Sequence, residues 1–344
     1  MSRRTNRAAL VAAVTAAALL LSGCVAGENG GQDEPATENT ATQGGTLNID
    51  FATYNPLSLI IKDQGWLEDA LADQEITVNW IQSAGSNKAN EGLKAGAIDV
   101  GSTAGSAALL ARANGSPIKT IGIYSQPEWA AIVVGADSTI SRVADLKGRT
   151  IAATLGTDPY FFLVQALDAN GLSINDVEVV NLQHADGWAA LQDGAVDAWA
   201  GLDPIMAGAE QAGAKLIYRN IDFNSYGFLN ATEAFLEAKP DVAQTVVDAY
   251  EKARAWALEN PEKTAAILAE VAALDQAVAN KVIIERTNLE IDPVPGQVQY
   301  DVLATIGPIL VSLGNVAKQD DVDAALDSLF DDTFAKAADP SRIG

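Results

Sequence analysis

The segment Gly92–Val100 (GLKAGAIDV) recurs 98 residues later as Ala190–Ala198 (ALQDGAVDA), and this repeat decides the fold. In each copy a helical stretch stops at a glycine, Gly96 or Gly194, the residue best suited to the left-handed position after a helix. A short apolar strand that carries an aspartate follows, then a turn of small residues. An alanine-rich helix comes next and ends near Gly115 or Gly213. The repeat therefore predicts two copies of one helix–strand–helix unit.

Strands and helices alternate around both copies. Apolar segments of strand length are Leu47–Phe51, Ile76–Trp80, Ile118–Tyr124, Thr150–Thr154 and Val177–Leu182. Residues 56–71 and 159–170 have helical apolar spacing, and the chain beyond Glu233 is almost entirely helical, with start signals at Pro240 and Pro261. Alternation of this kind is typical of α/β sheets covered by helices, and two copies of the unit predict two α/β lobes.

Five short motifs add a family resemblance. They are Gly65–Glu68 (GWLE), Gly96–Asp99 (GAID), Val143–Ala152 (VADLKGRTIA), Gly194–Trp199 (GAVDAW) and Asp203-Pro204. Together they resemble the sulfonate, nitrate and taurine solute-binding family of ABC importers, from about Thr46 to at least Phe235. The resemblance implies the type II periplasmic-binding-protein fold, in which two lobes are joined by two crossover segments. It also implies a helical C-terminal region packed on lobe 1.

The crossings are expected near residues 133–136 and 225–229. Lobe 1 would then be discontinuous and consist of residues 46–132 and 227–344, whereas lobe 2 would be residues 133–226. The family further implies a membrane permease and a separate ATPase as partners.

The N-terminal sequence resembles a bacterial lipoprotein signal peptide. Three arginines precede an uncharged run of 14 residues, Ala8–Leu21, which is too short for a bilayer-spanning helix. The run ends at Leu21-Ser22-Gly23-Cys24, and Cys24 is the only cysteine of the chain. We therefore expect residues 1–23 to be a signal peptide and Cys24 to carry lipid. Residues 24–45 contain no aromatic side chain and are expected to form a flexible tether. The protein would be extracytoplasmic and held on the cell membrane.

The composition supports a large acidic globular domain. The chain has 344 residues, of which 48% are hydrophobic, and a formal net charge of −23. Loss of the signal peptide would remove three arginines and no acid, so the remaining chain would be more negative still. Such a charge argues against nucleic acid as a partner, because binding to phosphates needs basic patches. We expect a monomer without a cofactor.

Four turns that follow strands are candidates for ligand binding. Ligands of open α/β sheets lie beyond the carboxyl ends of the strands, where helix N-termini favour oxyanions. The candidate residues in these turns are Tyr54, Asn55, Gly85, Ser86, Thr103, Gly105, Ser106, Gly156, Thr157, Asp158 and Tyr160. Backbone N–H groups and hydroxyls of this kind can hold a sulfonate or nitrate. Each serine or threonine can instead be only a helix N-cap.

Acidic and aromatic residues leave the cargo open. If Asp158 or Asp203 faces the cleft, it would suit an ammonium group, and Trp129 or Tyr160 could stack on a ring. A sulfonate such as an alkanesulfonate or taurine is the first expectation. Nitrate and a thiamine-type pyrimidine precursor are the alternatives.

No arrangement of residues points to catalysis or to a metal. The single histidine, His184, cannot form a zinc site of the usual kind alone, and it is expected at the surface or at the cleft edge. No phosphate-binding loop with the Lys-Ser/Thr ending occurs, so the chain is not expected to hydrolyse ATP. The sequence therefore predicts a binding protein and not an enzyme. An enzyme built on the same fold would need a cluster of reactive side chains in the cleft, and an adhesion protein would need a large exposed apolar patch.

Overall fold

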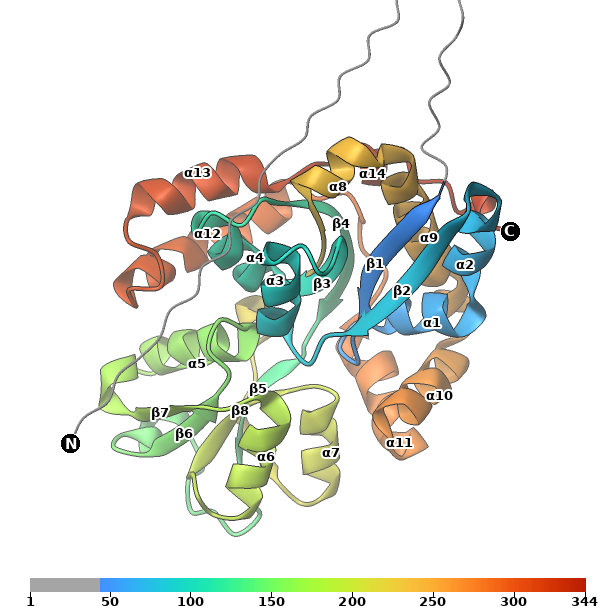
Figure 1. Ribbon diagram of the computed structural model, residues 1–344. Helices are drawn as coiled ribbons and strands as arrows, with labels where there is room; N and C mark the ends of the chain where they lie inside the picture. The colour runs from blue at the N-terminus through green and yellow to red at the C-terminus, as the bar shows by residue number, and fades with distance from the viewer. Residues whose placement is uncertain (1–43) are drawn as a thin grey trace, which may run out of the picture. The chain divides into compact units, whose positions relative to one another are not determined.

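The computed structural model describes residues 44–344, which contain two β-sheets flanked by helices (Figure 1). The predicted signal peptide and most of the predicted tether, including Cys24, lie outside the described residues. No helix of the described part is long and apolar enough to cross a membrane. We call each sheet with the helices that cover it a lobe.

Lobe 1 contains a six-stranded sheet in the order β11-β4-β10-β3-β1-β2. β1 pairs with β2 and β3 in parallel, whereas β10 runs antiparallel to β3 and β4. The strands are β1 (Gly45–Phe51), β2 (Ile76–Gln82), β3 (Val100–Ala104), β4 (Ile118–Pro127), β10 (Gly227–Thr232) and β11 (Thr287–Asn288).

Helices from both ends of the described chain belong to lobe 1. The N-terminal ones are α1 (Pro56–Gln64), α2 (Trp66–Leu71), α3 (Ser86–Lys94) and α4 (Gly105–Ala113). The C-terminal ones are α8 (Glu233–Ala238), α9 (Pro240–Glu259), α10 (Pro261–Ala272), α11 (Gln276–Asn280), α12 (Gln297–Ser312), α13 (Gln319–Leu329) and α14 (Thr333–Lys336), and a π-helical turn, η5 (Lys281–Glu285), follows α11. The predicted helical C-terminal region is confirmed.

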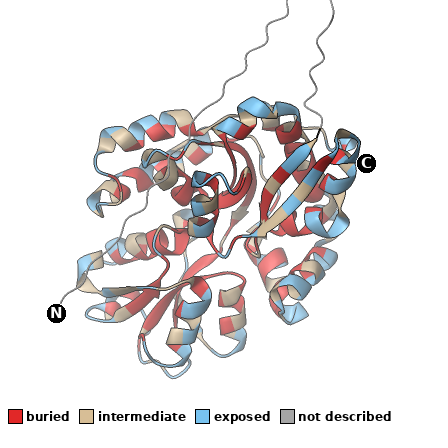
Figure 2. Ribbon diagram, in the orientation of Figure 1, coloured by how far each residue is buried: buried red, intermediate tan, exposed pale blue. Residues whose placement is uncertain are grey.

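Lobe 2 contains a five-stranded sheet in the order β7-β6-β8-β5-β9. Its strands are β5 (Ala130–Val134), β6 (Thr150–Ala153), β7 (Glu178–Asn181), β8 (Ala198–Leu202) and β9 (Lys215–Tyr218). Its helices are α5 (Asp158–Ala169), α6 (His184–Gln192) and α7 (Ile205–Gln211). In Figure 2 the central strands of both sheets, such as β3, β10, β5 and β8, are buried, whereas the edge strands β2, β7 and β9 are largely intermediate or exposed.

The repeat seen in the sequence has one structural role in both lobes. Asp99 precedes β3, and its carboxylate accepts a hydrogen bond from the backbone N–H of Asn48 in β1 (2.8 Å). Asp197 precedes β8 and accepts from the N–H of Thr150 in β6 in the same way (3.0 Å). In each lobe this aspartate therefore ties the start of one strand to its parallel neighbour.

Two local predictions differ from the structure. The helical pattern over residues 56–71 is divided into α1 and α2, because Gly65 has a left-handed backbone (φ 67°) and ends the first helix. The first crossing lies between Pro127 and Ala130, before the expected residues 133–136, since β5 already pairs with β8 and β9 of lobe 2. Only Glu128 and Trp129 separate β4 from β5, and no turn residue marks the change of sheet. The second crossing lies between Tyr218 and Gly227, next to the expected position.

Candidate functional site

The two lobes touch where helices α3 and α6 begin. Gly85 precedes α3 in lobe 1, and His184 is the first residue of α6 in lobe 2. A Cβ atom added to Gly85 would lie 3.0 Å from His184 Nε2 and 2.9 Å from Asn87 Oδ1. A glycine is therefore needed here for the close approach of the lobes. Both helix N-termini carry N–H groups without intrahelical partners, which gives this junction a positive partial charge.

His184 is buried, not at the surface, with a side chain only 1% exposed. Its Nδ1 lies 3.1 Å from Thr154 Oγ1, and the Thr154 hydroxyl donates its one proton to the carbonyl of Leu182 (2.7 Å). Nδ1 must therefore be the donor to Thr154, and Nε2 is left as an acceptor. Burial lowers the pKa of His184 to about 4, so the ring is neutral at pH 7.

Several buried polar atoms near the carboxyl ends of the strands lack a hydrogen-bond partner among the described residues. Nε2 of His184 is one of them, and Asn87 Oδ1 is another. Gln183 Oε1, just before α6, belongs to the same group. Buried polar atoms are usually paired, so such a group at one junction indicates where a ligand or water binds.

Asp158, at the start of α5 in lobe 2, is hydrogen-bonded to lobe 1 and to both crossing segments. Its Oδ1 accepts from Ser106 Oγ of α4 (2.6 Å) and from Ser225 Oγ (2.5 Å). Oδ2 accepts from Trp129 Nε1 (2.9 Å) and from the backbone N–H of Ser225 (2.8 Å). Burial raises the pKa of this carboxyl, and the four hydrogen bonds oppose that effect. Because four protein donors already use the carboxylate, it has little capacity left for a ligand ammonium group.

The backbone N–H groups at the start of α4 donate hydrogen bonds to the second crossing segment. The N–H of Gly105 points at the carbonyl oxygens of Ser225 (3.2 Å) and Tyr226 (3.1 Å), and the N–H of Ser106 donates to Ser225 Oγ (2.8 Å). The Thr103 hydroxyl donates to the carbonyl of Ala104 and accepts from Asn230. The first N–H groups of α4 are thus capped by the protein itself.

The predicted residues of lobe 2 are brought to the same region. Thr157 does not cap α5 with its side chain, since its hydroxyl donates to the carbonyl of Thr154 (2.7 Å). Gly156 has a left-handed backbone (φ 75°) and faces Leu110 of α4. Tyr160 is buried, with its ring against Phe161. Gly156 also lines a cavity of about 220 Å³ together with residues of α3 and α4.

The remaining predicted residues of lobe 1 have structural partners. Tyr54 donates from its hydroxyl to the carbonyl of Ser102 (3.0 Å), and its ring meets Trp129 edge-on. The Asn55 side chain caps α1 through the N–H of Ser58. The Ser86 hydroxyl accepts from the N–H of Ala104 (2.9 Å), so it ties α3 to the end of β3.

Asp203 is paired with a residue that the sequence did not nominate. Arg286 Nη1 lies 3.2 Å from both carboxylate oxygens of Asp203, and Arg286 Nη2 contacts Glu210. Burial raises the pKa of Asp203 to about 6 although the guanidinium opposes the shift. The protein itself therefore supplies the cation that pairs with Asp203, in the place that a ligand ammonium group would have taken.

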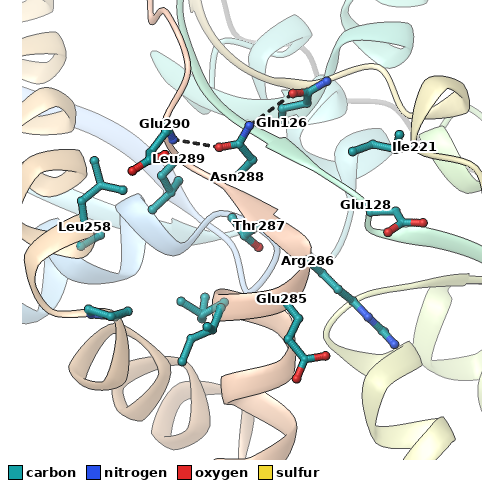
Figure 3. Close-up of a pocket in the computed structure, with 14 residues that line it drawn as sticks. Gln126, Glu128, Ile221, Leu258, Glu285, Arg286, Thr287, Asn288, Leu289 and Glu290 are labelled. Carbon is teal, nitrogen blue, oxygen red and sulfur yellow. Dashed lines mark hydrogen bonds between the residues drawn. The ribbon is translucent and has the colours of Figure 1, made fainter.

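A cavity of about 350 Å³ is lined in part by Arg286, the partner of Asp203 (Figure 3). It is formed by the end of β4, η5, β11 and the turn between α9 and α10, and it contains none of the predicted site residues. Arg286 thus connects this cavity with Asp203, whereas the unpaired acceptors His184 Nε2 and Asn87 Oδ1 do not line it.

Sequence reasoning missed Arg286, and it expected His184 at the surface or the cleft edge without nominating it as a site residue. His184 could have been nominated from the sequence. It follows the strand predicted at residues 177–182 and precedes a helix, as the residues of the four chosen turns do. Arg286 had no local signal, because its partners Asp203 and Glu210 are more than seventy residues away.

Two α/β lobes, joined by two crossing segments and meeting at helix N-termini, define the chain as a protein of the two-lobed periplasmic-binding-protein fold. The family described as NMT1/THI5 like matches residues 59–264, and the chain belongs to this family. The aliphatic sulfonates-binding proteins of Escherichia coli and Bacillus subtilis, both named as putative, are similar. The first is 31% identical over 65% of this chain and 71% of its own length. The second is 32% identical over 67% and 70%. The resemblance predicted from the sequence motifs is confirmed.

Solved structures agree on the fold. The alkanesulfonate-binding protein SsuA of Xanthomonas axonopodis pv. citri, bound to MOPS, superposes with a TM-score of 0.74 at 24% identity, over 82% of this chain and 98% of that one. The desulfurization enzyme DSZB shares the fold at 16% identity and a TM-score of 0.62, over 85% of this chain and 97% of that one. At these identities the likeness concerns the fold alone.

Proposed function

We propose that this protein is the extracytoplasmic solute-binding component of an ABC importer and that it captures a small sulfonate between its lobes. The observation that carries the proposal is the similarity, at 31% and 32% identity, to two proteins named as aliphatic sulfonates-binding. An alkanesulfonate or taurine is the expected cargo. Nitrate and a thiamine-type pyrimidine remain the alternatives.

The interlobe junction supports an anionic ligand. Helices α3, α5 and α6 all begin there, and helix N-termini bind oxyanions through unpaired N–H groups. The carboxylates of Asp158 and Asp203 are taken up by protein donors, so they do not have to repel a sulfonate directly. Contacts from both lobes would favour the closed arrangement when ligand is bound, and the closed form would dock on the permease.

Calorimetric titration of the full-length protein, purified in detergent, tests the proposal. The panel contains taurine, C2–C8 alkanesulfonates, nitrate, thiamine and its pyrimidine precursor. At least one sulfonate is expected to bind in the micromolar range or tighter, at ~−8 kcal/mol or below. Binding of the pyrimidine or nitrate alone would transfer the assignment to that alternative.

Alanine substitutions at two separate glycines, Gly85 and Gly135, test the location of the ligand. Gly85→Ala places a methyl group against His184 and Asn87, and we expect it to weaken sulfonate binding at least about tenfold. At Gly135 no described atom lies within 4 Å of an added Cβ, so Gly135→Ala should bind as the wild type does. Equal affinities in the two variants would place the ligand elsewhere.

The enzyme alternative has a direct test as well. A binding protein returns its ligand unchanged, whereas an enzyme on this fold would convert it. The sulfonate that binds is incubated with the protein for hours and analysed by mass spectrometry. Any product that accumulates with time and protein concentration would contradict a purely binding role.

The membrane anchor is the last part of the proposal. Lipidation of Cys24 would hold the protein on the outer side of the membrane, close to the permease and its separate ATPase. The wild type is expected in the detergent phase after Triton X-114 partition, and a Cys24→Ser variant in the aqueous phase. The proposed monomer is checked by light scattering.

A further inference from the structure

The proton positions at His184 are fixed by its neighbours. Thr154 Oγ1 has one proton, which it donates to the carbonyl of Leu182, so it accepts from His184 Nδ1. The ring is neutral, and Nε2 therefore carries a lone pair. Among the described residues nothing donates to this atom, although the side chain is only 1% exposed.

A second acceptor points at the same place from the other lobe. Asn87 Oδ1, in the first turn of α3, also lacks a partner among the described residues. A Cβ on Gly85 would be 2.9 Å from this oxygen and 3.0 Å from His184 Nε2, so both acceptors lie beside the same glycine. Each lobe thus contributes one unpaired acceptor to the contact between the lobes.

The chemistry of these two atoms restricts which ligand group can lie against them. A sulfonate oxygen is itself an acceptor, so it gains nothing from either atom. An ammonium group could donate to both, but α3 and α6 begin here and their positive partial charges oppose a cation. A neutral O–H group can donate to one of the two acceptors, and water can pair with the other, without that electrostatic cost.

We infer that His184 and Asn87 form a specificity subsite that selects sulfonates carrying a neutral hydrogen-bond donor, such as a hydroxyalkanesulfonate. The inference rests on the proposed function, since it assigns only the part of the ligand beyond the sulfonate. The sulfonate itself is held by N–H groups at the helix N-termini, and the donor group of the ligand reaches His184 Nε2.

Three ligands of one size test the inference on the full-length wild-type protein. Isethionate, taurine and 1-propanesulfonate differ only in their terminal hydroxyl, ammonium or methyl group. Calorimetry should give isethionate an affinity about tenfold higher than that of either other ligand, the value of one hydrogen bond. Equal affinity for propanesulfonate, or a preference for taurine, would overturn the inference and leave the proposed function intact. If no sulfonate binds, the proposed function fails.

Variants at His184 assign the preference to that side chain. His184→Phe keeps a ring but removes the acceptor, and isethionate should then bind no more than about twofold better than propanesulfonate. His184→Gln restores an acceptor at the end of a side chain of similar length and should recover part of the preference. If the preference survives in His184→Phe, another residue provides it.

A measurement on the wild type does not depend on how the variants fold. Because His184 is the only histidine, ¹⁵N-histidine labelling gives one pair of ring nitrogen resonances. In the free protein Nδ1 should be protonated and Nε2 bare, and isethionate should shift the Nε2 resonance as it donates to that atom. No shift with isethionate, or protonation of Nε2 with propanesulfonate, contradicts the subsite.

The threonine that fixes the ring has a matched control on β6. Thr154→Val removes the acceptor of the Nδ1 proton and should reduce the isethionate preference, because Nε2 is then no longer held as the acceptor. Thr150→Val changes the first residue of β6, where only backbone atoms, the N–H and the carbonyl oxygen, bond to Asp197. An equal effect of both substitutions would remove Thr154 from the subsite as a positioning residue.

Discussion

Arg286 Nη1 lies 3.2 Å from both carboxylate oxygens of Asp203, and this ion pair joins the C-terminal part of lobe 1 to the turn after β8. Both side chains are buried, at 3% and 4% exposure. A buried pair adds little net stability when both partners are present, but removal of one leaves an uncompensated charge. The main effect of the pair is therefore to fix the position of the turn after β8 against lobe 1, and its net contribution to the free energy of unfolding is small.

Arg286→Met should lower the free energy of unfolding by about 3–5 kcal/mol at pH 8. Burial already raises the pKa of Asp203 to about 6, and loss of the guanidinium raises it further. The carboxyl of the variant is then protonated in the folded protein at pH 5, so the loss should be smaller there. Urea unfolding at both pH values measures this. An equal loss at pH 5 and pH 8 would mean that Asp203 does not carry the effect.

The control for this experiment is the pair between Arg219 and Glu128. Its charged atoms are 2.6 Å apart, but the side chains are 34% and 26% exposed. Arg219→Met should cost at most about 1 kcal/mol, because solvent screens the pair.

Asp158→Asn should destabilise the protein by about 1–3 kcal/mol, because the amide NH₂ cannot accept from the donors that meet the carboxylate. Asp168→Asn, at an exposed position of the same helix, is the matched control. Sulfonate affinity should be retained in the folded Asp158 variant. Loss of taurine binding alone would instead show that this carboxylate contacts an ammonium group.

Gly105→Ala should be among the most damaging glycine substitutions. Its Cβ would lie 2.4 Å from the carbonyl oxygen of Ser225 and 2.8 Å from Phe228 Cζ, so the crossing segment would have to move. We expect a loss of about 1–3 kcal/mol in thermal or urea unfolding, and less than about 0.5 kcal/mol for Gly135→Ala. Similar losses in the two variants would contradict the close packing at the second crossing.

Asp50 should make stability depend on pH. Burial raises its pKa to about 7, although Ser102 donates to it from both N–H and Oγ. The pKa is higher in the folded state than in the unfolded state, so the stabilising contribution is present below about pH 4 and lost as the pH rises through 7. Relative to wild type, Asp50→Asn should therefore gain stability from pH 5 to pH 8, by up to about 3 kcal/mol. Exposed Asp73→Asn serves as control, and a pH-independent difference for Asp50→Asn would rule out its titration.

Local patterns made much of the fold predictable. The glycine stop and the aspartate of the repeat lie within nine residues of each other, and the same bonds at Asp99 and Asp197 show why both copies keep them. The strands were also predictable, because each is a short apolar run and the burial of such a run is a local property of the sequence. In contrast, nothing local distinguishes β4 from β5 at Glu128, so the change of sheet was placed a few residues late.

The candidate site was less predictable, because its hydrogen bonds join distant parts of the chain. Asp158 meets Ser106, Trp129 and Ser225, which are 52, 29 and 67 residues away. From the sequence alone it is an acidic residue at a helix start, free to face a ligand. Only the packed lobes reveal that its donors come from the protein and that His184 Nε2 is the atom left without one.

The strand pairing at the crossings has a consequence for the architecture as a whole. Gly227 of β10 pairs with Ser125 of β4, so the chain returns to lobe 1 beside the point where it left. Topologically, lobe 2 is the loop of a β-hairpin, enlarged to an entire α/β layer. The entropy of closing a loop grows only with the logarithm of its length, so the hairpin tolerates this insertion. Exchange of lobe 2 between relatives would thus alter the lobe 2 half of the proposed ligand site while leaving the sheet of lobe 1 continuous.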